Sequence, residues 1–217
     1  METRVKVCCI QSPKEAETAV DCGASAVGLV ASMPSGPGVI EEAAIASIAR
    51  SVPPPIATFL LTSELVAERI AAQQRRCGTN TVQICDHVSP SVHRELRERI
   101  PGIGLVQVVH VESQASVDYA LSVEGTADAL LLDSGRPSAA TSELGGTGRT
   151  HDWRLSRAIR EGVRAPVFLA GGLHADNVSE AIRAVEPFGI DLCSGVRTAG
   201  RLDPEKLRAF FASVRDA

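Results

Sequence analysis

The stretch PVFLAGGLHADNVSEAIRAVEPFGIDLCSGV, residues 166–196, decides the fold, because two strand-like runs flank one helical stretch within it. Residues 166–170 and 189–194 are short and apolar, without the alternating polar positions of a half-exposed sheet, which is typical of buried parallel strands. Residues 175–185 have the amphipathic pattern of a surface helix. Since parallel neighbours need a crossover connection, this segment predicts one strand-helix-strand unit.

The same unit recurs along the rest of the chain. Further strand-like runs lie at residues 4–10, 26–31, 56–61, 81–85, 104–110 and 127–133. Further amphipathic stretches lie at residues 13–21, 41–50, 64–75, 90–99, 113–123, 153–161 and 204–214. Ser12, Pro13 and Glu15 form a capping box that opens the first of these helices. Eight alternating units in 217 residues predict an α/β fold, a (β/α)8 TIM barrel forming a single domain over residues 1–217. A doubly wound open sheet is the alternative, although residues 8–13 lack the glycine-rich turn that it favours.

Composition and charge narrow the classes of function. Lys and Arg number 22 against 26 Asp and Glu, so the net charge of -4 gives no basic patch for nucleic acid or an anionic membrane. No apolar run approaches the roughly 20 residues of a membrane-spanning helix, and the first residues do not resemble a signal peptide. The six cysteines include no C-x-x-C pair, and the five histidines lack the paired spacing of metal ligands. We expect a reduced, disulfide-free cytoplasmic protein, a monomer or homodimer, with no metal and no nucleic-acid or membrane partner.

Glycines follow the last two predicted strands, where TIM barrels commonly bind phosphate. Gly171 and Gly172 follow the seventh strand, and Ser194 and Gly195 come after the eighth, so backbone N-H groups can approach an anion closely at both places. The alternative is that these glycines only make tight turns. The longest loop, residues 134–152, contains Gly145 and Gly146, and we expect it to be an active-site loop rather than a plain connection.

Two side chains able to move protons end strands at the predicted barrel mouth. Cys8 lies near the end of the first strand and Asp133 ends the sixth. Lys6 and Cys8 share one face of the first strand, while Val5, Val7 and Cys9 form an apolar face suited to the helix layer. Alternation therefore predicts that Cys8 points into the barrel and that Cys9 is a packing residue. The alternatives are an inert buried thiol for Cys8 and a capping or loop carboxylate for Asp133.

Other polar residues near strand ends have no role that the sequence identifies. His110 ends the fifth strand and is either a mouth residue or a partly solvated structural histidine. Cys85 and Asp86 end the fourth strand without an evident partner. The Gly- and Pro-rich residues 33–38 follow the second strand directly, so we interpret them as a loop at the barrel top rather than a linker.

Over essentially its whole length the chain resembles the phosphoribosylanthranilate isomerases, a family of TIM barrels. The resemblance is an ordered series of motifs, highly specific in the second half and looser in the first. These motifs are Lys6-Val7-Cys8, GASAVG at 23–28, Val82-Gln83, LLDS at 131–134, GGTG at 145–148 with Asp152-Trp153, LAGGL at 169–173 with Asn177-Val178, and DLCSGV at 191–196.

The resemblance implies an aldose-ketose isomerase of tryptophan biosynthesis that needs no cofactor. Its small phosphosugar substrate would be N-(5-phosphoribosyl)anthranilate, converted by an Amadori rearrangement to the 1-deoxyribulose 5-phosphate product. The family's general base matches Cys8 and its general acid matches Asp133. A phosphate anchor at Gly171, Gly172, Ser194 and Gly195 would fix the sugar between them. Further substrate-binding or loop candidates are Asp191, Arg197, Gly145 and Gly146.

The chain departs from the family pattern at four places. The family usually has an arginine after the second strand that reaches the anthranilate carboxylate, and here the stretch is Ser35-Gly36-Pro37-Gly38. Cys9 replaces the usual glycine after the base, Arg197 replaces a common glutamate, and residues 83–86 read QICD. Two alternatives stay open: a divergent paralogue that isomerises or epimerises another phosphorylated aminosugar, and a non-catalytic phosphosugar-binding barrel.

Overall fold

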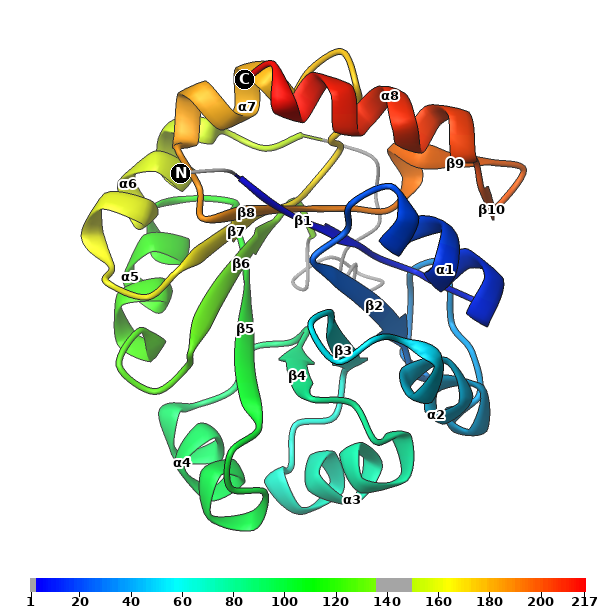
Figure 1. The fold of residues 1–217 in the computed structure, drawn as a ribbon. Helices are drawn as coiled ribbons and strands as arrows, with labels where there is room; N and C mark the ends of the chain where they lie inside the picture. The colour runs from blue at the N-terminus through cyan, green and yellow to red at the C-terminus, as the bar shows by residue number, and fades with distance from the viewer. Residues whose placement is uncertain (1–2, 136–149) are drawn as a thin grey trace.

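In the computed structural model, which describes residues 3–135 and 150–217, eight parallel strands close into a barrel (Figure 1). Each strand pairs with the next along the chain, and the first pairs with the eighth, with Val7 opposite Leu192. The strands are β1 (Arg4–Val7), β2 (Ala26–Val30), β3 (Ala57–Thr62), β4 (Thr81–Ile84), β5 (Gly104–His110), β6 (Ala129–Asp133), β7 (Val167–Leu169) and β8 (Gly189–Leu192). The predicted TIM barrel is therefore confirmed, and the open sheet is excluded.

In the described part of the chain, eight helices surround the barrel, one after each of its strands (Figure 1). They are α1 (Pro13–Asp21), α2 (Glu42–Ser51), α3 (Ala67–Cys77), α4 (Pro90–Arg99), α5 (Gln114–Val123), α6 (Trp153–Gly162), α7 (Val178–Val185) and α8 (Pro204–Arg215). A short 3-10 turn (Ser194–Val196) and a hairpin of β9 (Arg197–Thr198) and β10 (Arg201–Leu202) separate β8 from α8. This hairpin was not predicted from the sequence. No helix in the described ranges is long and apolar enough to cross a membrane.

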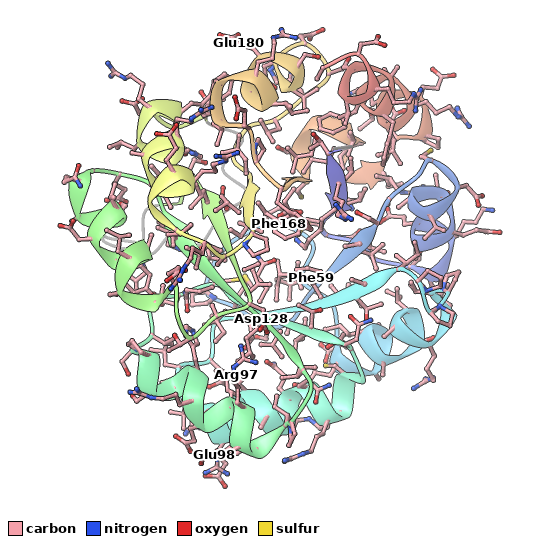
Figure 2. The ribbon with its side chains drawn as sticks, turned by 60° about the vertical axis from the view of Figure 1, so that its left-hand side comes forward. Phe59, Arg97, Glu98, Asp128, Phe168 and Glu180 are labelled. Atoms are coloured by element: carbon pink, nitrogen blue, oxygen red, sulfur yellow. The ribbon has the colours of Figure 1, made fainter. Side chains whose placement is uncertain are left out.

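The apolar residues form an outer layer against the helices and an inner layer inside the barrel. Val5 and Val7 of β1 belong to the outer layer, together with buried residues of the helices. Inside the barrel, the rings of Phe59 and Phe168 meet edge to face with centroids 6.2 Å apart (Figure 2). On the outside, Arg97 of α4 pairs with Asp128, just before β6, at 2.7 Å. The barrel interior is thus packed at its centre, which leaves the strand ends for a site.

Two local expectations near β1 need correction. The Ser12 hydroxyl accepts from the Glu15 N-H as predicted, but the Glu15 carboxylate binds the Gln11 N-H instead of completing a capping box with Ser12. Cys9 does not pack outward. The φ of Cys9 is 62°, outside the strand region, so side chains no longer alternate from this residue on. The Cys9 side chain therefore lies with Cys8 in the inner layer.

Candidate active site

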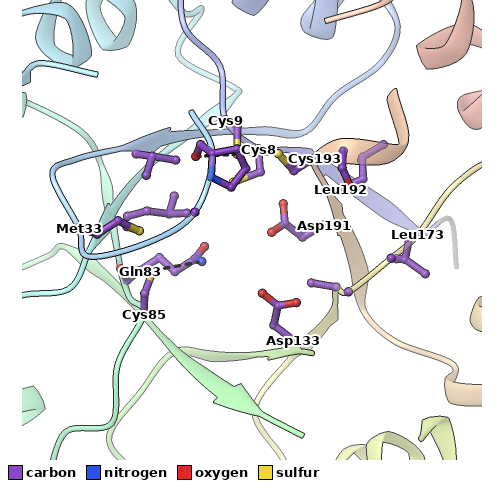
Figure 3. A pocket seen from close by; sticks show the side chains of 18 of the residues that line it. Cys8, Cys9, Met33, Gln83, Cys85, Asp133, Leu173, Asp191, Leu192 and Cys193 are labelled. Atoms are coloured by element: carbon purple, nitrogen blue, oxygen red, sulfur yellow. Dashed lines mark hydrogen bonds between the residues drawn. The ribbon is translucent and has the colours of Figure 1, made fainter. Parts of the chain in front are cut away.

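A pocket of about 650 Å³ opens at the carboxyl ends of the strands. Its wall includes Cys8 after β1, Asp133 at the end of β6, and Asp191 in β8. Figure 3 shows Cys8 and Asp133 on opposite sides of this pocket, with the Asp191 carboxylate between them. The structure thus brings together the two predicted proton-transfer residues, which are 125 positions apart in the sequence, at the end of the barrel where parallel strands of this fold carry their sites.

Cys8 points into the barrel because β1 keeps its alternation up to Val7. The Cys8 N-H donates to the Leu192 carbonyl of β8 at 2.8 Å, which fixes its backbone. Gly28 in β2 leaves room for the Cys8 side chain, since a methyl group added to Gly28 would come 2.9 Å from the Cys8 sulfur and 3.1 Å from Lys6 Nζ. A side chain at position 28 would therefore displace the candidate base.

Beneath the pocket lies a buried ion pair that the sequence analysis missed. Lys6 Nζ is fully buried and lies 2.8 Å from Asp191 Oδ1. It also lies 5.2 Å from the centroid of the Phe59 ring. Although burial opposes its charge, the Asp191 carboxylate raises the pKa of Lys6 above its ordinary value, so the ammonium stays charged. A lysine on the inward face of an otherwise apolar strand indicates a buried charge. Its partner could not be predicted from the sequence, because the two residues are 185 positions apart.

The Asp133 carboxyl has the environment of an acid. Burial raises the pKa of Asp133, and the Ser134 N-H at 2.7 Å and the charge of Lys6 offset only part of that rise. The raised pKa increases the share of the protonated form, which a proton donor needs. Burial also raises the pKa of Asp191, and the nearby Asp133 charge adds to this effect, although Lys6 acts against it.

The predicted phosphate residues lie at the same mouth. Gly171, Gly172 and Ser194 line the pocket. Both glycines have positive φ, 85° and 62°, a conformation that other residues rarely adopt. Within the described residues, no backbone carbonyl accepts from the N-H of Gly171 or Gly172. Gly195 is not in the pocket wall; an added side chain there would strike the Leu173 carbonyl, so it lets the loops after β7 and β8 approach closely.

Other candidate residues have different places. Gly145 and Gly146 lie outside the described residues. Arg197 is not in the pocket wall: its side chain is 7% exposed and pairs with Glu15 at 3.3 Å. The Arg197 guanidinium also donates to the backbone carbonyls of Cys8 and Cys9, so it holds the backbone at the candidate base.

Of the three residues without an assigned role, Cys85 lines the pocket, whereas His110 and Asp86 lie outside its wall. Cys85 lines the pocket, but burial raises its pKa to about 12, so it is a poor thiolate. The His110 Nε2-H donates to the Cys85 carbonyl at 2.8 Å, and burial lowers the pKa of His110, which makes it a neutral structural histidine. Asp86 accepts from the His87 N-H at 2.7 Å and is not in the pocket wall.

The loop of residues 33–38 lies over the pocket, as predicted for a loop at the barrel top. Met33, Ser35, Gly36 and Pro37 all contribute to the wall. Among the wall residues in the described part of the chain, none is Lys or Arg. No group of three or more His, Cys, Asp or Glu residues in the described ranges is arranged to hold a metal ion.

Comparison with known proteins identifies the family. A sequence model of the N-(5'phosphoribosyl)anthranilate (PRA) isomerases matches residues 5–213. The chain belongs to the PRA isomerase family. The N-(5'-phosphoribosyl)anthranilate isomerase of Methanocella arvoryzae is 34% identical over 214 residues, covering 98% of each chain.

Solved structures of PRA isomerases agree in fold. One, in complex with reduced 1-(o-carboxyphenylamino)-1-deoxyribulose 5-phosphate, superposes with a TM-score of 0.81 at 27% identity, covering 99% of this chain and 100% of that one. A monomeric form of the dimeric enzyme from Thermotoga maritima has a TM-score of 0.81 at 26% identity, again covering 99% and 100%. The family suggested by the sequence motifs is therefore confirmed.

Proposed function

We propose that this chain catalyses the Amadori rearrangement of N-(5'-phosphoribosyl)anthranilate to the 1-deoxyribulose 5-phosphate product, with Asp133 as general acid and Cys8 as general base. One observation carries the assignment: the two side chains face each other across a single pocket. The buried ion pair of Lys6 and Asp191, which joins β1 to β8, lies beneath this pocket. An acid and a base on opposite sides of one substrate are what a proton-shuttling isomerisation needs.

The first step opens the sugar ring. Protonated Asp133 gives its proton to the furanose ring oxygen, the C1-O bond breaks, and the anthranilate nitrogen supplies the electron pair that makes the iminium. The raised pKa of Asp133 supports this role, because burial favours the neutral acid in the free pocket. The carboxylate that remains lies near the Lys6 ammonium, whose charge also lowers the pKa of Asp133 and so stabilises the product of this step.

The second step removes the C2 proton, which the adjacent iminium has made acidic. The Cys8 thiolate takes that proton, and the C-H electron pair forms the C1-C2 double bond of an enolamine. The enolamine then tautomerises to the ketone. These steps exchange protons only, so the reaction as proposed uses no cofactor.

The phosphate group is proposed to bind at Gly171, Gly172, Ser194 and Gly195. Among the described residues, no backbone carbonyl accepts from the N-H groups of the two positive-φ glycines, and Ser194 and Gly195 begin a 3-10 turn. This anchor would hold C1 and C2 of the sugar between Asp133 and Cys8.

The loop of residues 33–38 supports a second candidate function. No Lys or Arg from the described residues lines the pocket, so these residues supply no cation to the anthranilate carboxylate. A phosphorylated aminosugar with an uncharged substituent on nitrogen would need no such cation. The alternative is therefore an isomerase with the same acid, base and phosphate loops but a different aglycone.

Turnover of freshly made N-(5'-phosphoribosyl)anthranilate, followed by loss of its fluorescence with and without a chelator, tests the proposal. We expect turnover that the chelator does not change. Folded protein that binds ribose 5-phosphate but leaves this substrate unchanged would favour the second candidate instead. We further propose that the chain acts in the cytoplasm, as a monomer or homodimer forming a single domain.

A further inference from the structure

Two cysteine sulfurs meet in the pocket wall, although neither takes part in the proposed chemistry. Cys9 follows β1, Cys193 follows β8, and their Sγ atoms lie 2.6 Å apart. Figure 3 shows both side chains at the pocket beside Cys8. Because β1 and β8 are neighbouring strands, with Val7 opposite Leu192, the barrel itself brings these two sulfurs together.

The backbone around Cys9 directs its thiol toward Cys193. The positive φ of Cys9 turns its side chain inward rather than toward the helix layer. Gly38 makes room for it: a methyl group added there would lie 2.5 Å from the Cys9 Cβ. The Cys9 thiol also donates to the Pro37 carbonyl at 3.5 Å. Loop and strand ends therefore hold the sulfur in place from two sides.

The surroundings of Cys193 favour a nucleophilic thiolate. The hydrogen bond between Cys193 and Cys9 lowers the pKa of Cys193, and the Arg197 guanidinium lowers it further against the effect of burial. The opposite holds for Cys77, where burial raises the pKa to about 11. Cys193 is only partly buried and faces the pocket, so a small oxidant reaches it from solvent.

We propose that Cys9 and Cys193 form a modification site: a dithiol in the pocket wall that hydrogen peroxide oxidises to a disulfide. The Cys193 thiolate attacks one peroxide oxygen, the O-O bond breaks and water leaves after protonation, giving a sulfenic acid at Cys193. The Cys9 sulfur then attacks the sulfenic sulfur, the S-O bond breaks, and a second water leaves. Two thiols lose two electrons and two protons in total, and an external dithiol reverses the reaction.

The disulfide would join Cys9, which follows the candidate base Cys8, to Cys193, which precedes Ser194. It would also bridge 184 positions of sequence across the β1-β8 edge, which restricts the unfolded chain. A disulfide holds its sulfurs about 2.05 Å apart, so roughly half an ångström of movement suffices. We therefore expect oxidation to leave the barrel intact and to raise its melting temperature.

Thiol titration of the denatured protein and peptide mapping test the site without reference to enzyme activity. After brief treatment with peroxide, the wild-type count should fall from six by two, and trypsin should release residues 7–14 linked to residues 184–197. Cys193→Ser and Cys9→Gly should each prevent the link, and glycine suits the backbone of position 9. Cys8→Ser should keep the link, and so should the control Cys22→Ser, which removes a partly exposed thiol elsewhere.

Three results would overturn the proposal. Wild type that keeps six thiols has no reactive pair at this site. A link that persists in Cys9→Gly and disappears in Cys8→Ser would make Cys8 the partner. A melting temperature that falls on oxidation would mean that the disulfide distorts the barrel, so the native positions of the two thiols do not suit the bond.

Discussion

The buried Lys6-Asp191 pair predicts a large and pH-dependent loss of stability in Lys6→Met. Methionine keeps an unbranched chain of similar length against Phe59 but removes the ammonium that lies 2.8 Å from Asp191. Breaking a buried ion pair by removing one partner costs about 3–5 kcal/mol, because the remaining charge is buried without compensation. We expect the free energy of unfolding at about pH 7 to fall by this amount. The double variant Lys6→Met/Asp191→Asn should lose less than the sum of the two single variants.

The direction of the pH dependence follows from Asp191. Burial already raises the pKa of Asp191, and the Asp133 charge adds to this, while Lys6 lowers it. Without Lys6 the folded-state pKa of Asp191 rises further above its unfolded value of about 4. The folded variant then holds the Asp191 proton more tightly than the unfolded chain, so the added loss of stability is absent below about pH 4 and grows as pH rises through the folded pKa.

Urea denaturation of wild type, both single variants and the double variant measures these terms. Trp153 is the single tryptophan and lies at the start of α6, so its fluorescence reports the barrel's outer layer, and circular dichroism reports the helices. The two probes must give the same transition for the free energies to be meaningful. A loss below about 1 kcal/mol at pH 7 in Lys6→Met would refute the reasoning, given the expected 3–5 kcal/mol. So would a defect of equal size at about pH 5 and pH 8.

Three further outcomes follow from the same geometry. Gly38→Ala should lower the free energy of unfolding by about 1–3 kcal/mol, because Gly38 has a positive φ and its new methyl group would meet Cys9. Adding Cys9→Gly to this variant should recover part of the loss in urea denaturation. No recovery would place the strain elsewhere. Gly195→Ala should raise the KM for the phosphorylated substrate, because its methyl group pushes apart the loops after β7 and β8 at the Leu173 carbonyl; an unchanged KM would argue against a phosphate site there. The wild-type kcat/KM should fall toward high pH as Asp133, whose pKa is raised, loses the proton it must donate, and a profile that only rises with pH would contradict its role as acid.

The sequence predicted the barrel well because eight short runs rich in Val, Ile and Leu alternate with amphipathic stretches. Alternation along β1 also predicted the inward direction of Cys8, since Val5 and Val7 do pack against the helices. The same rule failed one residue later, because the backbone of Cys9 leaves the strand conformation at a φ of 62°. Alternation applies only while the strand continues, and β1 ends at Val7 rather than at residue 10 as expected.

Long-range pairs explain most of what the sequence did not predict. Arg197 was a substrate-binding or loop candidate, but its guanidinium pairs with Glu15 and donates to the backbone carbonyls of Cys8, Cys9 and Gly200. Lys6 finds Asp191, and Cys9 finds Cys193, only because β1 and β8 close the barrel. No local pattern encodes such partners, so the positions of Cys8 and Asp133 at the pocket were predictable, whereas the partners of Lys6, Cys9 and Arg197 were not.

The kinetics of acid and base variants test the central claim most directly. Turnover of N-(5'-phosphoribosyl)anthranilate should be measured for wild type, Cys8→Ser, Asp133→Asn and the control Cys22→Ser, whose thiol lies at the end of α1 outside the pocket. We predict that kcat falls by about 10²–10⁴ in each active-site variant while the control turns over like wild type. The expected remaining kcat is about 10⁻² of wild type or less. A folded Cys8→Ser or Asp133→Asn variant that keeps more than about a tenth of the wild-type kcat would contradict the proposed acid-base pair.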